Sequence, residues 1–424
     1  MASLPDCGLS ADINTCQTLH WKGIARVRTL TAALLAEPDQ LHTQLSTSLT
    51  RRQMMAAALT APLWPALSQA QDGRSMVSPL PLAKHALQFP RDLGSHPDFA
   101  IEWWYITGQL VSGQRQFGFQ LTFFRSRVPV TQGMRSSFAA KNLIFAHAAV
   151  TDVTGKRLLH DQRIARASGA AQVDLASASV TDTDLQLGNW LLKRTGSAYQ
   201  AQAEGSDFSF KLALQETQAL LLQGDQGLSR KGPQAEQASF YYSLPQLSVS
   251  GQLQVAGEPF KVQGKAWLDH EWSQSVMHPD AVGWDWIGMN LLDGSALTAF
   301  RLRTETGGAL WAGGSFREPT QVNPEVFGPQ DVVFTPGRRW KSPASGTTYP
   351  VEWSVLVTRK STAVTAPVTE RYTVKAVIDN QELNSRQSTG AIYWEGLSEL
   401  FDSQGKLVGR GYLEMTGYDS PLML

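Results

Sequence analysis

The sequence is poor in the residues that build several common kinds of functional site. Only two of its 424 residues are cysteines, Cys7 and Cys16. From residue 71 onward, therefore, the chain offers no disulfide, thiol nucleophile or thiolate metal site. Its eight histidines form no H-x-H, H-x-x-H or HExxH arrangement, so we predict no metal site. A G-x-S-x-G nucleophile elbow is also missing, and no glycine-rich stretch precedes a helix that would cradle a phosphate.

The chain also lacks an excess of either charge. Lys plus Arg and Asp plus Glu both number 37, which gives a formal net charge of zero. This balance argues against broad electrostatic attraction to nucleic acid. Tryptophan, in contrast, is abundant, with 13 residues. Each supplies a large apolar surface and one N–H donor, which suits a lined cavity or the plug of a barrel.

Residues 49–70, LTRRQMMAAALTAPLWPALSQA, have the features of an export signal. A hydroxyl residue and paired arginines at 50–52 match a twin-arginine motif. The moderately apolar run 54–67 is too short to span a bilayer stably, and 68–70 offers an A-x-A-like cleavage site. We therefore expect export to the periplasm by the twin-arginine route, with cleavage near Ala70.

The structural alternative for this segment is a buried helix interrupted by Pro62 and Pro65. Residues 1–48 lie upstream of the expected signal, where a short segment is usual. They are therefore interpreted as a disordered or misannotated N-terminal extension. No later stretch is long and apolar enough for a transmembrane helix.

From residue 76 onward the sequence predicts β-structure almost throughout. Short runs alternate apolar and polar residues and are separated by Gly, Asn, Asp and Ser turns, whereas long helical periodicity is scarce. Many short strands at this spacing indicate an all-β protein of sandwiches or barrels, with few short helices. The clearest expected strands are 117–125, 143–152, 208–214, 247–257, 260–269, 296–303, 349–357 and 370–378, with a hairpin turn at Asp293-Gly294.

An internal repeat divides this region in two. WWYITGQL (103–110) matches WDWIGMNL (284–291), and GKAWLD (264–269) matches GRGYLE (409–414). LTFFR (121–125) and LTAFR (297–301) follow the two opening segments in the same order. We therefore predict two tandem β-barrel domains, residues 76–275 and 276–424.

Several of these motifs together resemble the AttH-type lipocalin-like family, which includes hydroxyneurosporene synthases, the carotenoid 1,2-hydratases. The resemblance covers most of residues 85–420 and rests on HPDFAIEWWYITGQL (96–110), FAHAAVTD (145–152), WLDHEWS (267–273), GWDWIGMNL (283–291), YWEG (393–396) and GRGYLEMTGY (409–418). It implies two lipocalin-like β domains. It also implies addition of water to a carbon–carbon double bond of an acyclic carotenoid, without a cofactor. Many relatives have no evident link to a pigment pathway.

The stretch WLDHEW (267–272) holds the residue types that acid-catalysed hydration needs: an acid, a base and aromatic faces for a cation. In a regular strand Asp269 and Glu271 share one face, whereas His270 and Trp272 share the other. Two neighbouring buried carboxyls would raise one pKa and create a proton donor. The resemblance places the His-x-Trp pair in the active site. All four residues are therefore candidate catalytic residues, on the assumption that a strand irregularity or a domain seam lets both faces contribute.

The structural alternative is that this cluster only closes the barrel. A Trp plug near a barrel end and carboxylates paired with Lys, Arg or backbone N–H groups would explain the same residues. The repeat bears on this choice. The pattern shared by both copies is attributable to barrel architecture, whereas His270-Glu271-Trp272 is replaced by Met415-Thr416-Gly417 in the second copy and is specific to the first.

Five further residues are assigned to ligand binding: Glu102, Trp104, His147, Tyr242 and Trp284. Glu102 could orient a catalytic group and Trp104 could line a pocket, although both also suit an aromatic plug in the first strand. His147 stands among apolar residues, where a hydrogen-bonded core histidine is the ordinary interpretation. The motif Tyr393-Trp394-Glu395 is a further candidate for pocket wall or packing.

Two functions remain open at this point. One is a hydratase-type lyase acting on an isoprenoid or other unsaturated lipid, and the other is a non-catalytic periplasmic protein that binds or handles lipids. Both predict a hydrophobic small-molecule partner, such as a carotenoid, isoprenoid or lipid, and both are compatible with peripheral membrane contact. A weaker third interpretation has solid barrels and a surface that binds partners. A closed acid/His/water arrangement would favour catalysis, whereas Asp269 and Glu271 both paired in salt bridges would favour binding.

Overall fold

A computed structural model describes residues 82–170, 174–275, 277–360 and 367–422. The expected N-terminal extension, 1–48, and the expected export signal, 49–70, lie outside these residues. The chain from Val77 to Leu424 forms one compact unit. No helix within the described part of the chain has the length and apolar character that crossing a membrane requires.

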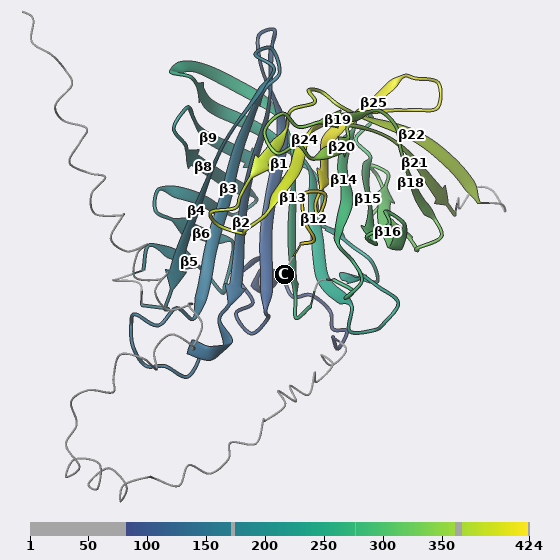
Figure 1. Cartoon of the computed structure of the whole chain (residues 1–424). Coiled ribbons are helices and arrows are strands. Elements are labelled where there is room, and N and C mark those ends of the chain that lie inside the picture. The colour runs from purple at the N-terminus through teal and green to yellow at the C-terminus, as the bar shows by residue number, and fades with distance from the viewer. Residues whose placement is uncertain (1–81, 171–173, 276, 361–366, 423–424) are drawn as a thin grey trace, which may run out of the picture. The chain divides into compact units, whose positions relative to one another are not determined.

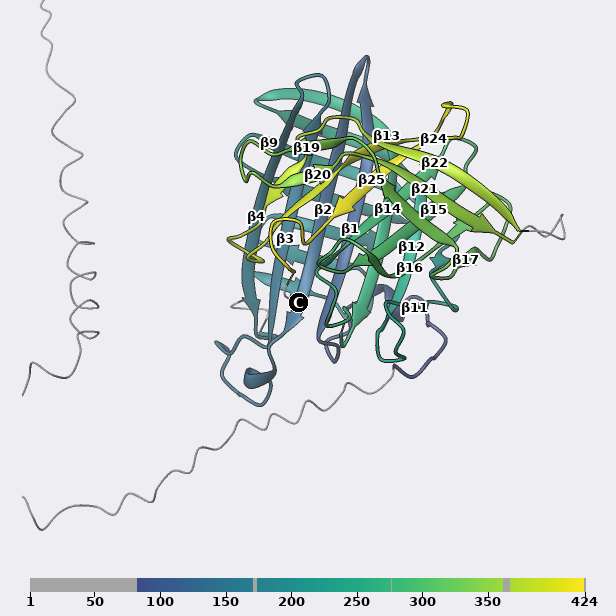
Figure 2. The same ribbon diagram turned by 45° about the vertical axis from the view of Figure 1, so that its right-hand side comes forward.

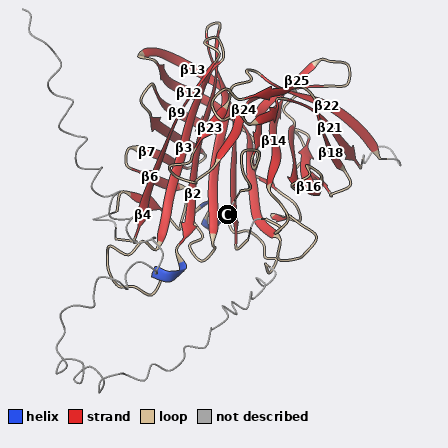
Figure 3. Cartoon of the chain, in the orientation of Figure 1, coloured by secondary structure: helices blue, strands red, loops and turns tan. Residues whose placement is uncertain are grey.

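The described chain is built almost entirely from β-strands, which confirms the all-β prediction (Figure 3). Its helical segments are two single 3₁₀ turns, η3 (Arg91–Leu93) and η4 (Pro129–Thr131). Five of the eight expected strands lie within single strands of the structure, and 247–257 and 370–378 end two residues beyond theirs. The expected strand 349–357 is wrong in its continuity, because Val351 divides it between two strands that belong to different sheets. In the expected hairpin turn Gly294 takes φ +92°, a left-handed conformation that glycine adopts without steric cost.

The first half of the chain forms one antiparallel sheet of 13 strands, in the order β4-β3-β2-β1-β13-β12-β9-β8-β7-β6-β5. The short strands β10 and β11 pair with β12 at the side of this path. The edge strand β4 approaches β5 and β6, so this sheet curls into a nearly closed barrel. The strands are β1 (Ile101–Ser112), β2 (Arg115–Arg127), β3 (Asn142–Asp152), β4 (Arg157–Ala167), β5 (Ala176–Ala178), β6 (Asp184–Leu187), β7 (Trp190–Thr195), β8 (Ala198–Glu204), β9 (Phe208–Gln215), β10 (Leu221–Leu222), β11 (Leu228–Arg230), β12 (Ala238–Val255) and β13 (Glu258–Ser273).

The second half forms a ten-stranded antiparallel sheet in the order β17-β16-β15-β14-β25-β24-β22-β21-β18, with β23 paired to β24. A two-stranded sheet, β19 (Arg339–Lys341) and β20 (Thr348–Pro350), accompanies it. The strands of the larger sheet are β14 (Gly283–Leu291), β15 (Ala296–Arg303), β16 (Ala309–Arg317), β17 (Glu325–Phe327), β18 (Val332–Pro336), β21 (Glu352–Arg359), β22 (Val368–Ala376), β23 (Glu382–Asn384), β24 (Ile392–Phe401) and β25 (Leu407–Met415).

The repeated sequence segments occupy corresponding places in the two sheets. In the first sheet β1 lies between β2 and β13, and in the second β14 lies between β15 and β25. The opening segment of each repeat is therefore the strand that pairs with both the following strand and the closing strand.

The two sheets pack against each other through a layer of shared side chains, which we call the seam. Strands β24 and β25 lie against β2 and β1 (Figures 1 and 2). The buried seam cluster combines residues of both halves, among them Tyr105, Trp267, Trp286 and Tyr412. Each sheet also encloses its own packed core. The division into two domains at residues 275/276 stays a prediction, because the sheets share this buried layer.

Candidate functional site

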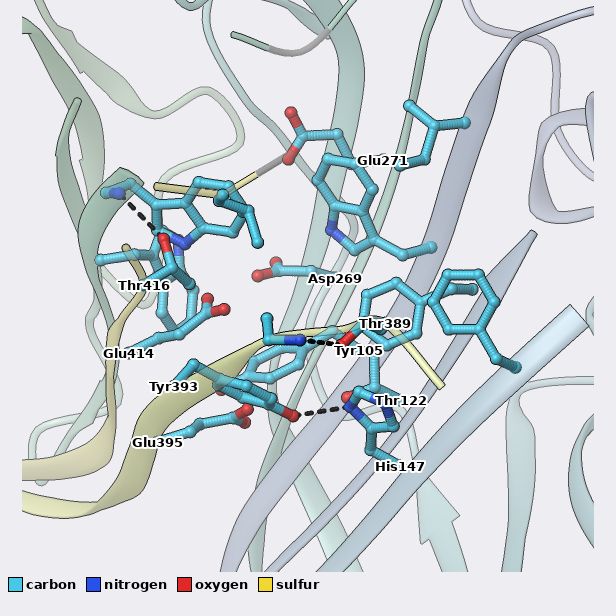
Figure 4. Close-up of a pocket in the computed structure, with 18 of the residues that line it drawn as sticks. Tyr105, Thr122, His147, Asp269, Glu271, Thr389, Tyr393, Glu395, Glu414 and Thr416 are labelled. Atoms are coloured by element: carbon cyan, nitrogen blue, oxygen red, sulfur yellow. Dashed lines mark hydrogen bonds between the residues drawn. The ribbon is translucent and has the colours of Figure 1, made fainter. Parts of the chain in front are cut away.

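A cavity of about 320 Å³ lies at the seam, between the two sheets rather than inside either one (Figure 4). Its walls come from β1, β2, β3, β12 and β13 of the first sheet and from β14, β15, β24 and β25 of the second. Aromatic rings supply much of the wall, and the titratable groups of both halves converge on it. The lining includes Trp103, Tyr105, Phe124, Phe145, His147, Lys231, Tyr241, Asp269, Glu271, Trp284, Trp286, Phe300, Ser388, Tyr393, Glu395 and Glu414.

Strand β13 divides the motif WLDHEW between two environments. It pairs with β1 in regular register, so neighbouring side chains point to opposite faces. Asp269 and Glu271 line the seam cavity. His270 and Trp272 lie on the other face, where Trp272 belongs to the core of the first sheet. Both faces are buried because the seam covers the outer one, with no irregularity in β13 itself.

Asp269 is fully buried in the cavity wall and has no cationic partner among the described residues. Its Oδ1 accepts hydrogen bonds from Ser243 Oγ at 2.5 Å and from Trp267 Nε1 at 2.7 Å. Its Oδ2 accepts one from Tyr241 Oη at 2.9 Å. Burial raises the pKa of Asp269 to about 7, although these three hydrogen bonds act to lower it. The carboxyl therefore exchanges a proton near neutral pH.

Glu395 and Glu414 are directly opposite each other on β24 and β25, and both face the cavity (Figure 4). Burial, and then the charge of Glu414, raise the pKa of Glu395 well above its usual range. Burial likewise raises the pKa of Glu414 to about 7. Like charges on a directly opposed pair are unfavourable, so at least one of the two carboxyls, Glu395, holds a proton at neutral pH.

The two carboxyl oxygens of Glu395 differ in their hydrogen bonding. Its Oε2 accepts a hydrogen bond from Gln120 Nε2 at 2.8 Å. Its Oε1 is buried and has no hydrogen-bond partner among the residues that the structure describes. Tyr105 Oη, which also lines the cavity, forms no hydrogen bond of good geometry within that part of the chain, although it lies near enough to Glu395 to act to lower the pKa of that carboxyl. Buried polar atoms are normally hydrogen-bonded, so unpaired ones that face a cavity indicate where a ligand or water would bind.

Glu271 differs from the other carboxyls because it is ion-paired. Lys231 Nζ lies 2.9 Å from Glu271 Oε1, and the hydroxyl of Ser239 donates a hydrogen bond to the same oxygen. Both charged side chains are buried and line the cavity. The two carboxylates of β13 therefore have different states: Glu271 is paired and Asp269 is not.

His147 reaches the cavity from β3 and connects the two sheets. Its Nδ1 lies 2.8 Å from Tyr393 Oη (Figure 4). Its Nε2 lies 2.8 Å from Ser388 Oγ. Burial lowers the pKa of His147 to about 3, so the imidazole is neutral at physiological pH. Trp284, the remaining ligand-binding candidate at the seam, also lines the cavity.

The other site candidates, Glu102, Trp104, Tyr242, His270 and Trp272, gather on the inner face of the first sheet. His270 Nε2 lies 2.9 Å from Glu102 Oε1, and its Nδ1 lies 3.0 Å from Tyr242 Oη. Trp104 stacks on the His270 ring with centroids 4.4 Å apart. These five residues do not line the seam cavity. The structure thus brings Asp269, Glu271, His147 and Trp284 together in one place and this second set in another.

Glu102 is the centre of the inner set. Burial alone would raise its pKa, but hydrogen bonds from His270 and His96 and the charge of Arg125 hold the pKa well below its usual range. Arg125 Nε donates to Glu102 Oε2 at 2.8 Å, and His96 Nδ1 lies 2.7 Å from Oε1. Ser95 Oγ also donates to Oε2 at 2.8 Å.

His96, Glu102 and His270 place potential metal-ligand atoms within 4.8 Å of one another. The donor set of two imidazoles and one carboxylate would suit zinc. Arg125, however, already supplies a buried positive charge to Glu102, and a divalent cation there would face that guanidinium. The arrangement therefore fits a charge-balanced hydrogen-bond network better than a metal centre.

Sequence reasoning found part of the cavity and missed several of its groups. It named Glu395 only within a motif for pocket wall or packing, and Glu414 only as the repeat counterpart of Asp269. Lys231 is absent from the candidates that the sequence indicates, and Tyr105 belongs to the aromatic cluster 102–105 without a role of its own. Strand alternation was the available signal for Tyr105, because it lies two residues from Trp103 on the same face. Nothing in the sequence connects Lys231, just after β11, with Glu271 on β13.

Comparison with known proteins places the chain among relatives of the same fold. The family model described as AttH-like matches residues 80–418. The crystal structure of a protein assigned as AttH from Nitrosomonas europaea is 42% identical, with a TM-score of 0.71, and the match covers 79% of this chain and 98% of that one. Kievitone hydratase from Nectria haematococca is 15% identical, with a TM-score of 0.59 over 79% of this chain and 94% of that one. At that identity the second likeness concerns the fold alone. No protein of curated function matches the sequence.

Proposed function

This chain belongs to the AttH-like family, and we propose that it is a hydratase-type enzyme that adds water across a carbon–carbon double bond. The substrate is an apolar small molecule bound at the seam. The observation that carries the proposal is an aromatic-walled cavity in which Glu395 is protonated at neutral pH, whereas the pKa values of Asp269 and Glu414 lie at about 7. A hydratase of the same fold agrees with this reaction class.

Glu395 is the proposed general acid. Its raised pKa keeps the carboxyl protonated, and its Oε1 is unpartnered among the described residues. Transfer of this proton to one alkene carbon forms a C–H bond and leaves a carbocation at the other carbon. Ring faces such as those of Tyr105 and Trp286 would stabilise the cation, by roughly 0.5–2 kcal/mol each.

Asp269 is the proposed general base. Three hydrogen-bond donors favour its ionised form, and its pKa of about 7 lies near the optimum for proton transfer at neutral pH. Water attacks the cation, a C–O bond forms, and the proton that water loses passes to Asp269. Proton exchange with solvent then returns Asp269 to its ionised form and Glu395 to its protonated form.

The size of the cavity limits the substrate. A volume of about 320 Å³ is near the lower end of the range for small-molecule sites, about 300–1,000 Å³. We therefore propose an unsaturated isoprenoid or lipid of modest size, or one end of a longer chain such as a carotenoid. The features of residues 49–70 support a periplasmic location for this reaction, which fractionation of cells would test.

The alternative, a lipid-binding protein without catalysis, receives support from one observation, the Lys231–Glu271 ion pair. Binding alone does not explain Asp269 and Glu395. An unpaired buried carboxyl costs free energy that an apolar residue of similar size would avoid. Acid–base catalysis accounts for both carboxyls, because Glu395 donates a proton and Asp269 accepts one.

The test is hydration of geranylacetone, which has isolated trisubstituted double bonds, in water enriched in ¹⁸O. We expect wild-type protein to form a labelled alcohol detected by mass spectrometry. Glu395→Gln and Asp269→Asn should each lower the rate by about 10²–10⁴-fold, the usual contribution of a general acid or base. Product in unchanged yield from both variants would reject these roles.

Two controls sharpen the result. Glu305→Gln, on an exposed turn between β15 and β16, should leave the rate unchanged. His270→Ala reports on the inner set, and a folded His270→Ala protein with full activity would restrict catalysis to the seam. If wild type and all variants bind the ketone but none converts it, the protein is a binder and the hydratase proposal fails.

A further inference from the structure

Lys231 is a buried cation in the cavity wall, among aromatic rings and carboxyl groups. Only 7% of the residue is exposed to solvent. Its ammonium lies 4.8 Å from the centre of the Tyr241 ring and 4.4 Å from the centre of the Phe300 ring. The proposed acid–base chemistry uses neither Lys231 nor its partner Glu271.

The hydrogen-bonding capacity of Lys231 is incompletely used. An ammonium group has three N–H donors. Within the described part of the chain, Glu271 Oε1 is its single ion-pair partner, at 2.9 Å, and the remaining contacts are the two aromatic faces. A buried ion pair adds little stability compared with apolar residues of the same volume. The donors that remain are therefore available to a ligand in the cavity.

The net charge of the Lys231–Glu271 pair determines which kind of ligand group can bind to it favourably. Lys231 and Glu271 together are neutral, so a carboxylate bound to Lys231 would place two anions around one cation. A pure hydrocarbon would leave the N–H donors unpaired and desolvated, which is also unfavourable. A neutral acceptor oxygen, such as the carbonyl oxygen of a ketone or ester, completes the hydrogen bonds without adding charge.

We propose that the ligand carries a neutral carbonyl oxygen that accepts a hydrogen bond from Lys231. Oxygen recognition rests on Lys231 and Glu271 alone, whereas the position of the double bond rests on the proposed hydratase function. Asp269 and Glu271 are two residues apart on one face of β13, which separates their Cα atoms by about 7 Å. The carbonyl is accordingly several bonds away from the reacting double bond and is not conjugated with it.

The test compares the affinity of three probes by quenching of tryptophan fluorescence. The probes are geranylacetone, the hydrocarbon with CH₂ in place of its carbonyl, and a carboxylic acid of matched chain length. We expect wild-type protein to bind the ketone about tenfold or more tightly than either other probe at pH 7. Equal affinity for ketone and hydrocarbon, or tighter binding of the acid, would overturn the proposal.

Two variants give signatures that a merely structural ion pair would not produce. Lys231→Met/Glu271→Gln removes both charges at similar volume and should abolish the preference for ketone over hydrocarbon. Glu271→Gln alone leaves an unbalanced ammonium and should make the acid the tightest ligand. Lys265→Met, an exposed lysine on the same strand β13, is the control and should keep the wild-type order.

Each outcome separates this proposal from the hydratase proposal. If the ketone binds through Lys231 but gains no water, carbonyl recognition stands and the hydratase proposal fails. If ketone and hydrocarbon bind and are hydrated equally well, the hydratase stands and carbonyl recognition fails. Should the double variant not fold, the three-probe comparison of wild type with Glu271→Gln still decides the matter.

Discussion

At the scale of single residues, the seam cavity contains carboxyl groups whose surroundings give them different roles. Glu271 has a cation 2.9 Å away and remains an ion-pair partner. Asp269 has three neutral donors and a pKa raised by burial to about 7. Glu395 has one donor and an unpartnered oxygen among the described residues. Environments that separate pKa values in this way are how one fold supplies both an acid and a base.

These raised pKa values predict how stability depends on pH. Asp269 titrates near 3.9 when unfolded and near 7 when folded, so between these values the folded protein binds more protons. The free energy of unfolding must therefore fall as pH rises through this window. Asn cannot ionise. Relative to wild type, Asp269→Asn should thus gain about 1–3 kcal/mol between pH 4.5 and pH 7, a discounted share of the roughly 1.4 kcal/mol per pKa unit.

Urea unfolding at the two pH values measures this difference. The comparison of wild type with variant across pH removes any constant cost of substituting the hydrogen-bonded carboxyl. Glu305→Gln, at an exposed site outside the cavity, is the control substitution. A constant Asp269→Asn difference at both pH values would mean that Asp269 is ionised throughout and cannot have the raised pKa.

At the scale of the strand, β13 is buried on both faces, and each face has its own network. The outer face contributes Asp269 to the cavity, and the inner face contributes His270 to the Glu102 network. Glu102 on β1 also accepts from Arg125 on β2. The inner network thereby connects three adjacent strands of the first sheet, β2, β1 and β13.

This connection predicts that Glu102 acts chiefly on stability. Glu102→Gln leaves the guanidinium of Arg125, which is 2% exposed, without its carboxylate. Breaking a buried pair at one partner costs about 3–5 kcal/mol, and we expect that loss in the free energy of unfolding. Glu102→Gln/Arg125→Met, which removes both charges, should be less destabilised than the single variant.

Chemical denaturation of both proteins gives the two free energies, and probe affinity measured on folded protein separates the roles. Unchanged affinity together with a large loss of stability would assign Glu102 to the network. A stable Glu102→Gln protein with weakened ligand binding would instead support the ligand-binding role predicted from its place beside Trp103 and Trp104.

The strand scale also explains what the sequence could and could not predict. Alternation of apolar and polar residues located the strands and separated Asp269 from His270, because those signals are local. The repeat located β1 and β14 as counterparts. The partners of Asp269 could not be predicted, since Tyr241 and Ser243 come from β12, whose register shifts between Leu244 and Leu247. Glu395 and His147 approach the same cavity only when two sheets pack, and no short-range pattern records that contact.

At the scale of the whole molecule, the cavity exists because two curled sheets share a wall. Each sheet has its own packed core, and the cavity described above lies between them at the seam. Contacts that hold the sheets together should therefore control binding even where they do not touch the ligand. Thr151 Oγ1, for example, donates to Gln381 Oε1 across the seam at 2.8 Å.

Gln246 is a suitable residue for testing this dependence, because it forms hydrogen bonds between the two sheets outside the cavity. It is buried at the register shift of β12, and its backbone N–H donates to Asn290 Oδ1 at 2.7 Å. Its Nε2 donates to the carbonyl oxygens of Leu291 at 2.9 Å and Ser295 at 3.0 Å. Gln246→Ala removes these two side-chain hydrogen bonds, and each carbonyl keeps one backbone donor, Gly294 N–H for Leu291 and Leu291 N–H for Ser295. We expect a loss of about 1–3 kcal/mol in the free energy of unfolding and weaker binding of geranylacetone.

Gln254→Ala, on the exposed side of the same strand, is the control, and it should change stability by less than about 0.5 kcal/mol and leave affinity unchanged. Urea unfolding and fluorescence quenching measure both effects. If Gln246→Ala loses stability yet binds the probe as wild type does, the cavity does not depend on the Gln246 hydrogen bonds. Apolar packing between the two sheets would then be sufficient to maintain the cavity.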